Sequence, residues 1–177
     1  MHGYLEQALA NITPSTALDV GAGSGRDANW LAAKGWQVTA TEPATELLNL
    51  AKQHSQENVT WCNAALPTLK QLPKAHKQFE LILLSAVWMH LPTEDRLAAI
   101  KRLSELLSNT GRMYISLRFG PSDPERPMYP VSYEQLQALA ADNGLTARNL
   151  NPVPSKDGLQ RSDVEWVTVE LLKTGKK

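Results

Sequence analysis

Leu18-Asp19-Val20-Gly21-Ala22-Gly23-Ser24-Gly25-Arg26 is the stretch of sequence that decides the fold of this chain. Its apolar first part predicts a short buried strand, and the alternating glycines let the backbone approach a ligand where a Cβ would collide. A helix is expected from Gly25 to a left-handed end at Gly35, and its first amide groups would favour a carboxylate or a phosphate. A second strand, from Trp36 to Thr41, then leads to Glu42, whose carboxylate can accept hydrogen bonds from both hydroxyls of a ribose. The pattern predicts a nucleotide-binding unit.

The glycine spacing argues against a dinucleotide. The dinucleotide fingerprint is Gly-x-Gly-x-x-Gly, and Arg26 stands where its third glycine would be. Asp19, two residues before the first glycine, would repel phosphates but can attract an ammonium, directly or through water. An ammonium, a carboxylate and a ribose together describe S-adenosylmethionine.

The motif Asp19-x-Gly21-x-Gly23-x-Gly25 with Glu42 resembles the class I S-adenosylmethionine-dependent methyltransferases, and the likeness runs over nearly the whole chain. Residues 58–67 look like the third strand and adenine loop of that family, with Cys62 and Asn63 in place of the usual glycine and aspartate. The carbonyl of Asn63 can still accept a hydrogen bond from the adenine amino group. Residues 79–92 are similar to the fourth strand and the turn that lines the methyl-transfer site. The chain has no Asn-Pro-Pro-Tyr motif, which argues against a DNA amino-methylating enzyme of the usual kind.

The resemblance implies an α/β, Rossmann-like fold with a doubly wound, mostly parallel sheet of seven strands in the order 3-2-1-4-5-7-6, the last strand antiparallel. Alternating strand and helix signals support a parallel sheet covered on both faces. After the fourth strand, we expect a helix that is capped by Thr93 and buries Leu97, Ile100, Leu103 and Leu107. A turn at 109–111 and a strand at 112–118 are expected to follow. The last elements are expected to be a helix that begins with a Ser132–Gln135 capping box and ends at 143–144, and a final strand at 164–172.

Composition limits the class of protein. We expect one domain over residues 1–177, because this length suits a single core. Lys and Arg total 18, as do Asp and Glu, so no global basic field indicates nucleic acid as a partner. We expect a cytoplasmic protein without a membrane partner, because the sequence has a single cysteine, no signal-like run and no apolar stretch of membrane length. The four histidines and Cys62 show no metal-ligand spacing, so we expect no metal, and we expect a monomer or weak homodimer.

The resemblance also implies which residues contact the cofactor. These are Asp19, Gly21, Ala22, Gly23, Gly25, Arg26, Glu42, Pro43, Asn63, Ala64, Ser85 and Ala86. Two of them have an alternative structural interpretation. Arg26 can bind the methionine carboxylate or pair with Asp27, and Glu42 can bind ribose or only cap the following helix.

Candidate residues for the methyl acceptor follow the fourth and fifth strands. The ordinary pKa of a histidine suits His90 as the base that deprotonates a hydroxyl, amine or thiol, although it can instead cap the next helix. Trp88 can stack on an aromatic acceptor or pack in the core. Three further side chains lie on segments expected to converge above the sheet and would suit an anionic small acceptor: Arg118, Tyr129 and Arg161.

Two segments can enclose the site. Residues 119–131 contain four prolines and form either a wall of the acceptor site or an inert connector, and residues 1–12 are expected to form a lid. The expected activity is in-line methyl transfer from S-adenosylmethionine to an O, N or S atom of a small molecule, giving S-adenosylhomocysteine. The alternatives are an RNA or protein methyltransferase and a non-catalytic S-adenosylmethionine-binding regulatory subunit.

Overall fold

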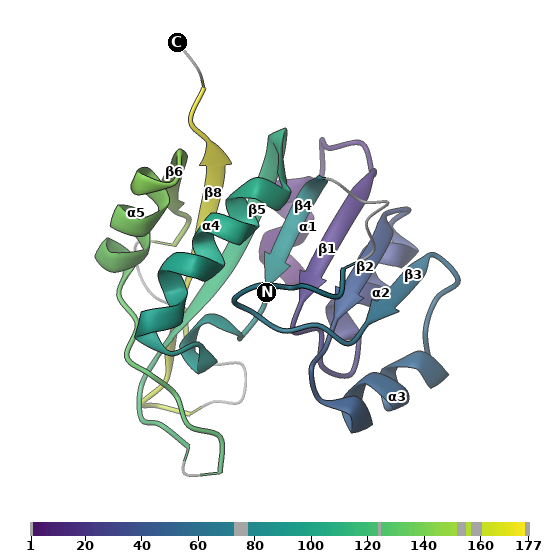
Figure 1. The fold of residues 1–177 in the computed structure, drawn as a ribbon, viewed down its shortest axis with the longest axis horizontal. Coiled ribbons are helices and arrows are strands. Elements are labelled where there is room, and N and C mark those ends of the chain that lie inside the picture. The colour runs from purple at the N-terminus through teal and green to yellow at the C-terminus, as the bar shows by residue number, and fades with distance from the viewer. Residues whose placement is uncertain (1, 73–77, 124, 152–154, 157–160, 176–177) are drawn as a thin grey trace.

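One sheet forms the centre of the molecule (Figure 1). The computed structural model describes residues 2–72, 78–123, 125–151, 155–156 and 161–175. The strands lie in the order β3-β2-β1-β4-β5-β8-β6, and β8 runs antiparallel to both of its neighbours in that order. The bounds are β1 Thr16–Val20, β2 Gln37–Thr41, β3 Val59–Cys62, β4 Phe79–Leu84, β5 Leu107–Phe119, β6 Leu145–Asn149 and β8 Glu165–Lys173. This confirms the predicted seven-stranded order, and the short strand β7, Ser155–Lys156, adds a further pairing to β8.

The helices cover both faces of the sheet. They are α1 His2–Leu9, α2 Arg26–Ala33, α3 Thr45–Gln53, α4 Arg96–Leu106 and α5 Tyr133–Asp142, with 3-10 turns η1 Trp88–His90 and η2 Thr93–Asp95. Side chains alternate along β4: Leu81 and Leu83 join a core cluster with Leu31 of α2, whereas Ile82 joins a second cluster with Ile100 of α4. The two clusters are the two layers that the doubly wound fold predicts.

Strand β5 differs from its prediction. The turn expected at 109–111 is instead part of this strand, which begins at Leu107 directly after α4. Leu107 pairs with Phe79 and Arg112 with Leu81, so the residues between them bulge out of register. A Cβ at Gly111 would lie 2.8 Å from the carbonyl oxygen of Phe79, so this glycine serves a close approach of two strands.

The buried face of α4 also differs from its prediction. Thr93 does not cap an α-helix: it begins η2, no side-chain cap is formed, and α4 starts at Arg96. Leu97 is 54% exposed, whereas Ile100 and Leu103 are fully buried as predicted. Arg96 is buried in its place, because its guanidinium donates to the carbonyls of Leu91 and Pro130.

Two leucines on α4 give a test of this packing. We expect Leu103→Ala to lower the free energy of unfolding by about 2–5 kcal/mol, because it removes a fully buried side chain. The matched variant Leu97→Ala should change it by less than about 0.5 kcal/mol. Urea denaturation of both variants measures the difference, and equal effects would contradict the different burial of the two leucines.

Helix α1 is anchored on the sheet. Leu5 is 1% exposed and packs in the core cluster that contains Leu31 and Trp36, and Lys34 Nζ lies 3.8 Å from the Glu6 carboxylate. Helix α1, which belongs to the expected lid, therefore packs along one face of the sheet. That the lid covers a cofactor stays a prediction.

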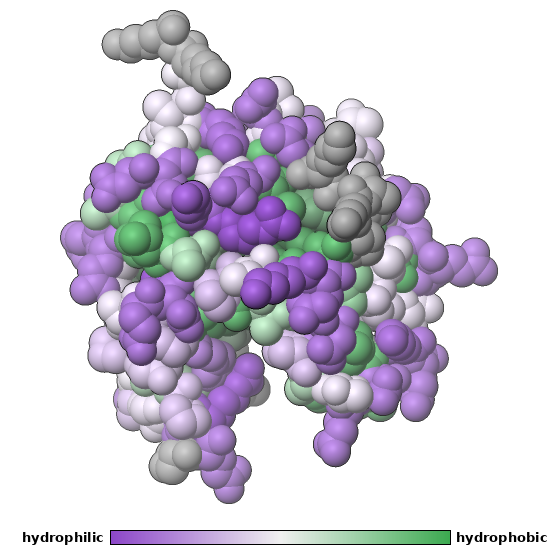
Figure 2. Space-filling view, viewed as in Figure 1, coloured by the Kyte–Doolittle hydropathy of each residue, from purple (hydrophilic) through white to green (hydrophobic). Residues whose placement is uncertain are grey.

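The candidate site lies at the carboxyl edge of the parallel strands. In this type of sheet, ligands bind outside the carboxyl ends of the strands. The glycine loop after β1, Glu42 after β2, Asn63 after β3 and Ser85 after β4 all lie there. Figure 2, viewed as Figure 1, shows a notch in the lower border of the surface, on the side of these strand ends. None of the helices in the described part of the chain is long and apolar enough to cross a membrane.

Candidate active site

The three loop glycines have different roles. All have positive φ, at 67° for Gly21, 57° for Gly23 and 87° for Gly25. A Cβ would lie 2.7 Å from Val87 at the first position and 2.8 Å from Trp61 at the third, so both glycines are needed for packing. At Gly23, no atom lies within 4 Å of such a Cβ. This glycine therefore faces open space, where a ligand can approach the backbone.

Glu42 fixes the loop. Its carboxylate is buried and accepts the N–H of Gly23 on Oε2 at 2.9 Å and the N–H of Ala44 on Oε1 at 2.8 Å. The Ala22 N–H also donates to the Thr41 carbonyl at 2.8 Å. Glu42 thus bonds the N–H of Ala44, the residue before α3, although no side-chain cap of this helix is formed. Each carboxylate oxygen has a second lone pair, so the same group can accept ribose hydroxyls, and that role stays a prediction.

Asp19 is a buried carboxyl group with an unpaired oxygen. It is 1% exposed, and Oδ2 has no hydrogen-bond partner among the described residues. Burial, together with the nearby carboxylate of Asp27, raises the pKa of Asp19 to about 8, although the backbone N–H of Ala28 and the charge of Arg26 oppose the shift. A buried acceptor without a donor is costly, so this oxygen suits a cation or a water.

Arg26 pairs with its neighbour. Its Nε lies 2.9 Å from Oδ1 of Asp27, a buried carboxylate at the start of α2. The pairing interpretation is confirmed, and binding of the methionine carboxylate stays a prediction.

An apolar cavity of about 150 Å³ opens beside the loop, lined by Gly21, Pro43, Ala64 and His90 together with Val20, Ala65, Leu66, Val87 and Leu91. Asn63 lies next to it, and its side-chain amide donates to the Pro43 carbonyl at 3.2 Å. Its carbonyl oxygen accepts no hydrogen bond from the described residues. The arrangement suits the predicted adenine contact. Pro43, Ala64 and His90 thus meet around one cavity, although they come from different parts of the sequence.

The turn after β4 holds His90 in one tautomer. Ala86 has a φ of 60° and donates its N–H to Oγ of Ser116 at 2.7 Å, which fixes the turn that begins at Ser85. His90 Nδ1 lies 3.0 Å from the carbonyl oxygen of Pro127. A carbonyl oxygen can only accept, so Nδ1 carries the proton and the neutral ring keeps its lone pair on Nε2. Burial lowers the pKa of His90 from its ordinary 6.5, so the ring is neutral at pH 7.

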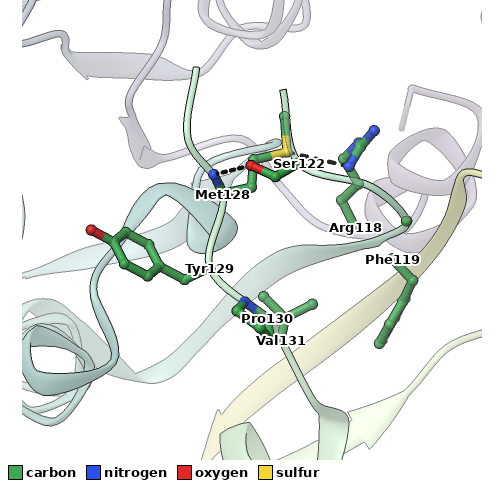
Figure 3. Close-up of a pocket in the computed structure, with 8 residues that line it drawn as sticks. Arg118, Phe119, Ser122, Met128, Tyr129, Pro130 and Val131 are labelled. Carbon is green, nitrogen blue, oxygen red and sulfur yellow. Dashed lines mark hydrogen bonds between the residues drawn. The ribbon is translucent and has the colours of Figure 1, made fainter. Parts of the chain in front are cut away.

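The predicted acceptor residues do not all come together. Arg118 and Tyr129 line a second cavity of about 290 Å³ with Phe119, Gly120, Ser122, Met128, Pro130 and Val131 (Figure 3). Trp88 is 1% exposed, with the guanidinium of Arg96 5.9 Å from its ring centre, so it packs in the core and the prediction that it lines an acceptor pocket is wrong. Arg161 is exposed and is not part of the lining of this cavity.

The residues that sequence reasoning missed lack a sequence signal. Val87 and Leu66 line the first cavity as ordinary apolar side chains, and Ser116 fixes the turn from inside β5. Within the described residues, no cluster of three or more His, Cys, Asp or Glu side chains could hold a metal ion.

Comparison with known proteins defines the class. A family model described as a methyltransferase domain matches residues 17–111, more than half of the chain. The chain therefore belongs to this methyltransferase domain family. The matched region contains the glycine loop, Glu42 and His90.

Relatives of known structure and sequence agree with this class. The chain is similar to a ubiquinone biosynthesis O-methyltransferase from Coxiella burnetii, at 27% identity over 113 residues, which are 64% of this chain and 47% of the relative. It thus spans about half the length of the curated relatives it matches. The fold is similar to that of the 1,6-didemethyltoxoflavin-N1-methyltransferase of Burkholderia thailandensis, solved with S-adenosylhomocysteine, with a TM-score of 0.76, 21% identity and coverage of 98% of this chain and 76% of that one. It is also similar to the magnesium protoporphyrin IX methyltransferase of Synechocystis, solved with S-adenosylmethionine, with a TM-score of 0.73, 22% identity and coverage of 96% and 74%.

Proposed function

We propose that this protein is an S-adenosylmethionine-dependent methyltransferase that acts on a small-molecule acceptor. The observation that carries the proposal is the pairing of Glu42 with Gly23. A buried carboxylate at the tip of β2 holds the loop by the Gly23 N–H, while the space next to Gly23 is open. Such a site suits a ribose beside a backbone that can be approached closely.

The residues present fit the adenine, the ribose and the methionine ammonium of the methyl donor. Glu42 would accept the ribose hydroxyls, and the Asn63 carbonyl would accept the adenine amino group. The unpaired Oδ2 of Asp19 would accept the methionine ammonium, directly or through a water. When bound, the donor supplies a methyl group already activated by the positive charge on sulfur.

The chain contributes alignment and a base. Holding the acceptor and the methyl group in line lowers the activation free energy by an amount on the order of several kcal/mol, because the entropy of bringing them together is lost on binding. The Nε2 lone pair of His90 would take the proton of a protonated nucleophile. The turn from Ser85 to Ala86, fixed by Ser116, would position the methionine end of the donor.

A small acceptor is supported by the shape and charge of the molecule. The cavity beside Arg118 measures about 290 Å³, and the net charge of the chain is zero. The neighbouring structures are named for small-molecule acceptors, such as 1,6-didemethyltoxoflavin. These observations favour a small molecule over an RNA or protein substrate, for which a basic surface would be expected.

Calorimetric titration with S-adenosylmethionine, S-adenosylhomocysteine and NAD tests the cofactor. We expect the first two to bind and NAD not to bind, and binding of NAD alone would overturn the proposal. A metabolite screen for release of S-adenosylhomocysteine then tests turnover. Tight cofactor binding without turnover of any acceptor would favour the non-catalytic alternative.

Because Asp19 is protonated in the free protein, we expect the binding of S-adenosylmethionine to release a proton. With a pKa of about 8, the free protein holds this proton at pH 6 to 7. An ammonium beside Oδ2 favours the carboxylate, so we expect binding to release up to one proton and affinity to rise with pH in this window, by at most about tenfold per unit. Calorimetry in buffers of different ionisation enthalpy measures the release. Asp19→Asn should abolish it, and an unchanged release in that variant would contradict the assignment.

A further inference from the structure

We propose that the cavity lined by Arg118, Met128 and Tyr129 binds the carboxylate of a small aromatic hydroxy acid, with Arg118 as the anchor. The inference rests on the proposed function and names its substrate class. It starts from the guanidinium of Arg118, which has no acidic partner among the described residues.

Arg118 is buried and poorly satisfied. It is 9% exposed, and its Nη1 donates to the Pro121 carbonyl at 2.8 Å and to Sδ of Met128 at 3.2 Å. Its Nε is buried without a partner, and no carboxylate of the described residues lies within ion-pair distance. A buried charge without a partner is costly, and a thioether is a weak acceptor. An anion that took the place of the Met128 sulfur would give the guanidinium a counter-charge and would give Nη1 a stronger acceptor.

The walls of the cavity suit one aromatic ring. Arg118 and Met128 point toward one another at one side, whereas the ring of Phe119 points away from them (Figure 3). The other lining residues combine the apolar side chains of Pro130 and Val131 with the polar side chains of Ser122 and Tyr129. No Asp or Glu is among its lining residues. The volume of about 290 Å³ lies just below the range for small-molecule sites, roughly 300–1,000 Å³. One arginine beside apolar side chains, in a cavity of this size, suits an acid with a single ring.

The same loop connects this cavity to His90. The Pro127 carbonyl accepts from Nδ1 of His90 at 3.0 Å, and the Tyr129 N–H donates to the Met89 carbonyl at 2.7 Å. The positive charges of Arg118 and Arg126 are close enough to lower the pKa of His90. His90 thus lines the cavity beside the glycine loop and contacts, through Pro127, the loop that lines the cavity of Arg118.

An acid anchored on Arg118 would present its hydroxyl toward His90. In the reaction, the hydroxyl oxygen forms a bond to the methyl carbon while the carbon–sulfur bond breaks. The electron pair of that bond stays on sulfur, which gives S-adenosylhomocysteine, and the hydroxyl proton passes to Nε2 of His90. The positive charges near His90 would also stabilise a developing phenolate.

The test compares an acid with its neutral isostere. The protein is loaded with S-adenosylhomocysteine and titrated with 4-hydroxybenzoate and with 4-hydroxybenzamide. We expect the acid to bind roughly 10- to 100-fold more tightly, the usual range for a charge-assisted hydrogen bond at a buried site. Arg118→Gln should abolish this preference. The control Arg148→Gln should retain the preference for the acid, because Arg148 is an exposed residue of β6 that pairs with Glu170 of β8.

Each outcome decides the inference. Equal binding of acid and amide to the wild type, or binding of neither, overturns it without any variant. A preference for the acid that survives Arg118→Gln in a variant with an unchanged melting temperature overturns the anchor. Failure of the wild type to bind S-adenosylhomocysteine would instead overturn the proposed function.

Discussion

Gly23→Ala is expected to weaken S-adenosylmethionine binding by about 100-fold, the upper part of the range of roughly 1–3 kcal/mol for overpacking. The added methyl group would occupy the open space at the loop, which the proposed function assigns to the cofactor. The Gly23 N–H would still donate to Glu42, so the loop itself is expected to keep its shape. Calorimetric titration of the variant with S-adenosylmethionine measures the loss.

Gly144→Ala is the matched control for this prediction. Gly144 has a φ of 71° and also has no atom within 4 Å of an added Cβ, but it lies after α5. Both variants should lose about 1 kcal/mol of stability, because alanine is strained at positive φ. Only the Gly23 variant should lose cofactor affinity. Equal affinities in the two variants would show that the open space at Gly23 is not the cofactor site.

His90→Asn is expected to lower kcat by about 100- to 10,000-fold for an acceptor that starts protonated, the usual contribution of a general base. The side-chain amide of asparagine can still donate to the Pro127 carbonyl, as Nδ1 does, but it offers no basic nitrogen. The affinity for S-adenosylmethionine should stay within a few-fold of the wild type. A kcat that is unchanged would assign His90 a structural role only.

The pH profile supplies an independent readout of the same residue. Because burial lowers the pKa of His90, the base is neutral and active at pH 7, and the rate should fall only as pH drops below 6.5. This acid limb should be absent from the residual activity of His90→Asn. A limb retained in the variant would assign the titration to another group.

The nucleotide half of the fold could be predicted because its signals are local. The strand before the glycines, the helix after them and the position of Glu42 follow from adjacent residues, and the structure places them as expected. The order of the strands came from the resemblance and is confirmed. The N-cap of α5 was also predicted, since Ser132 accepts the N–H of Gln135 three residues later.

The errors arose where distant contacts decide the structure. Gly111 indicated a turn, but the approach of β4 uses it inside a bulge. Leu97 fits an apolar stripe, yet it is exposed, whereas Arg96 beside it is buried and bonds to two carbonyls. Trp88 was open to two interpretations, and only tertiary packing decided for the core. No local pattern predicts that the Pro127 carbonyl accepts from His90 or that the Tyr129 N–H donates to the Met89 carbonyl.

The bonds of Glu42 have a kinetic consequence. Because its carboxylate already holds Gly23 and Ala44, the cofactor loop is ordered before any ligand arrives. Little conformational entropy remains to be lost on association, and no rearrangement has to precede it. The observed association rate of S-adenosylmethionine should therefore rise linearly with its concentration, without the plateau that a slow opening step would impose.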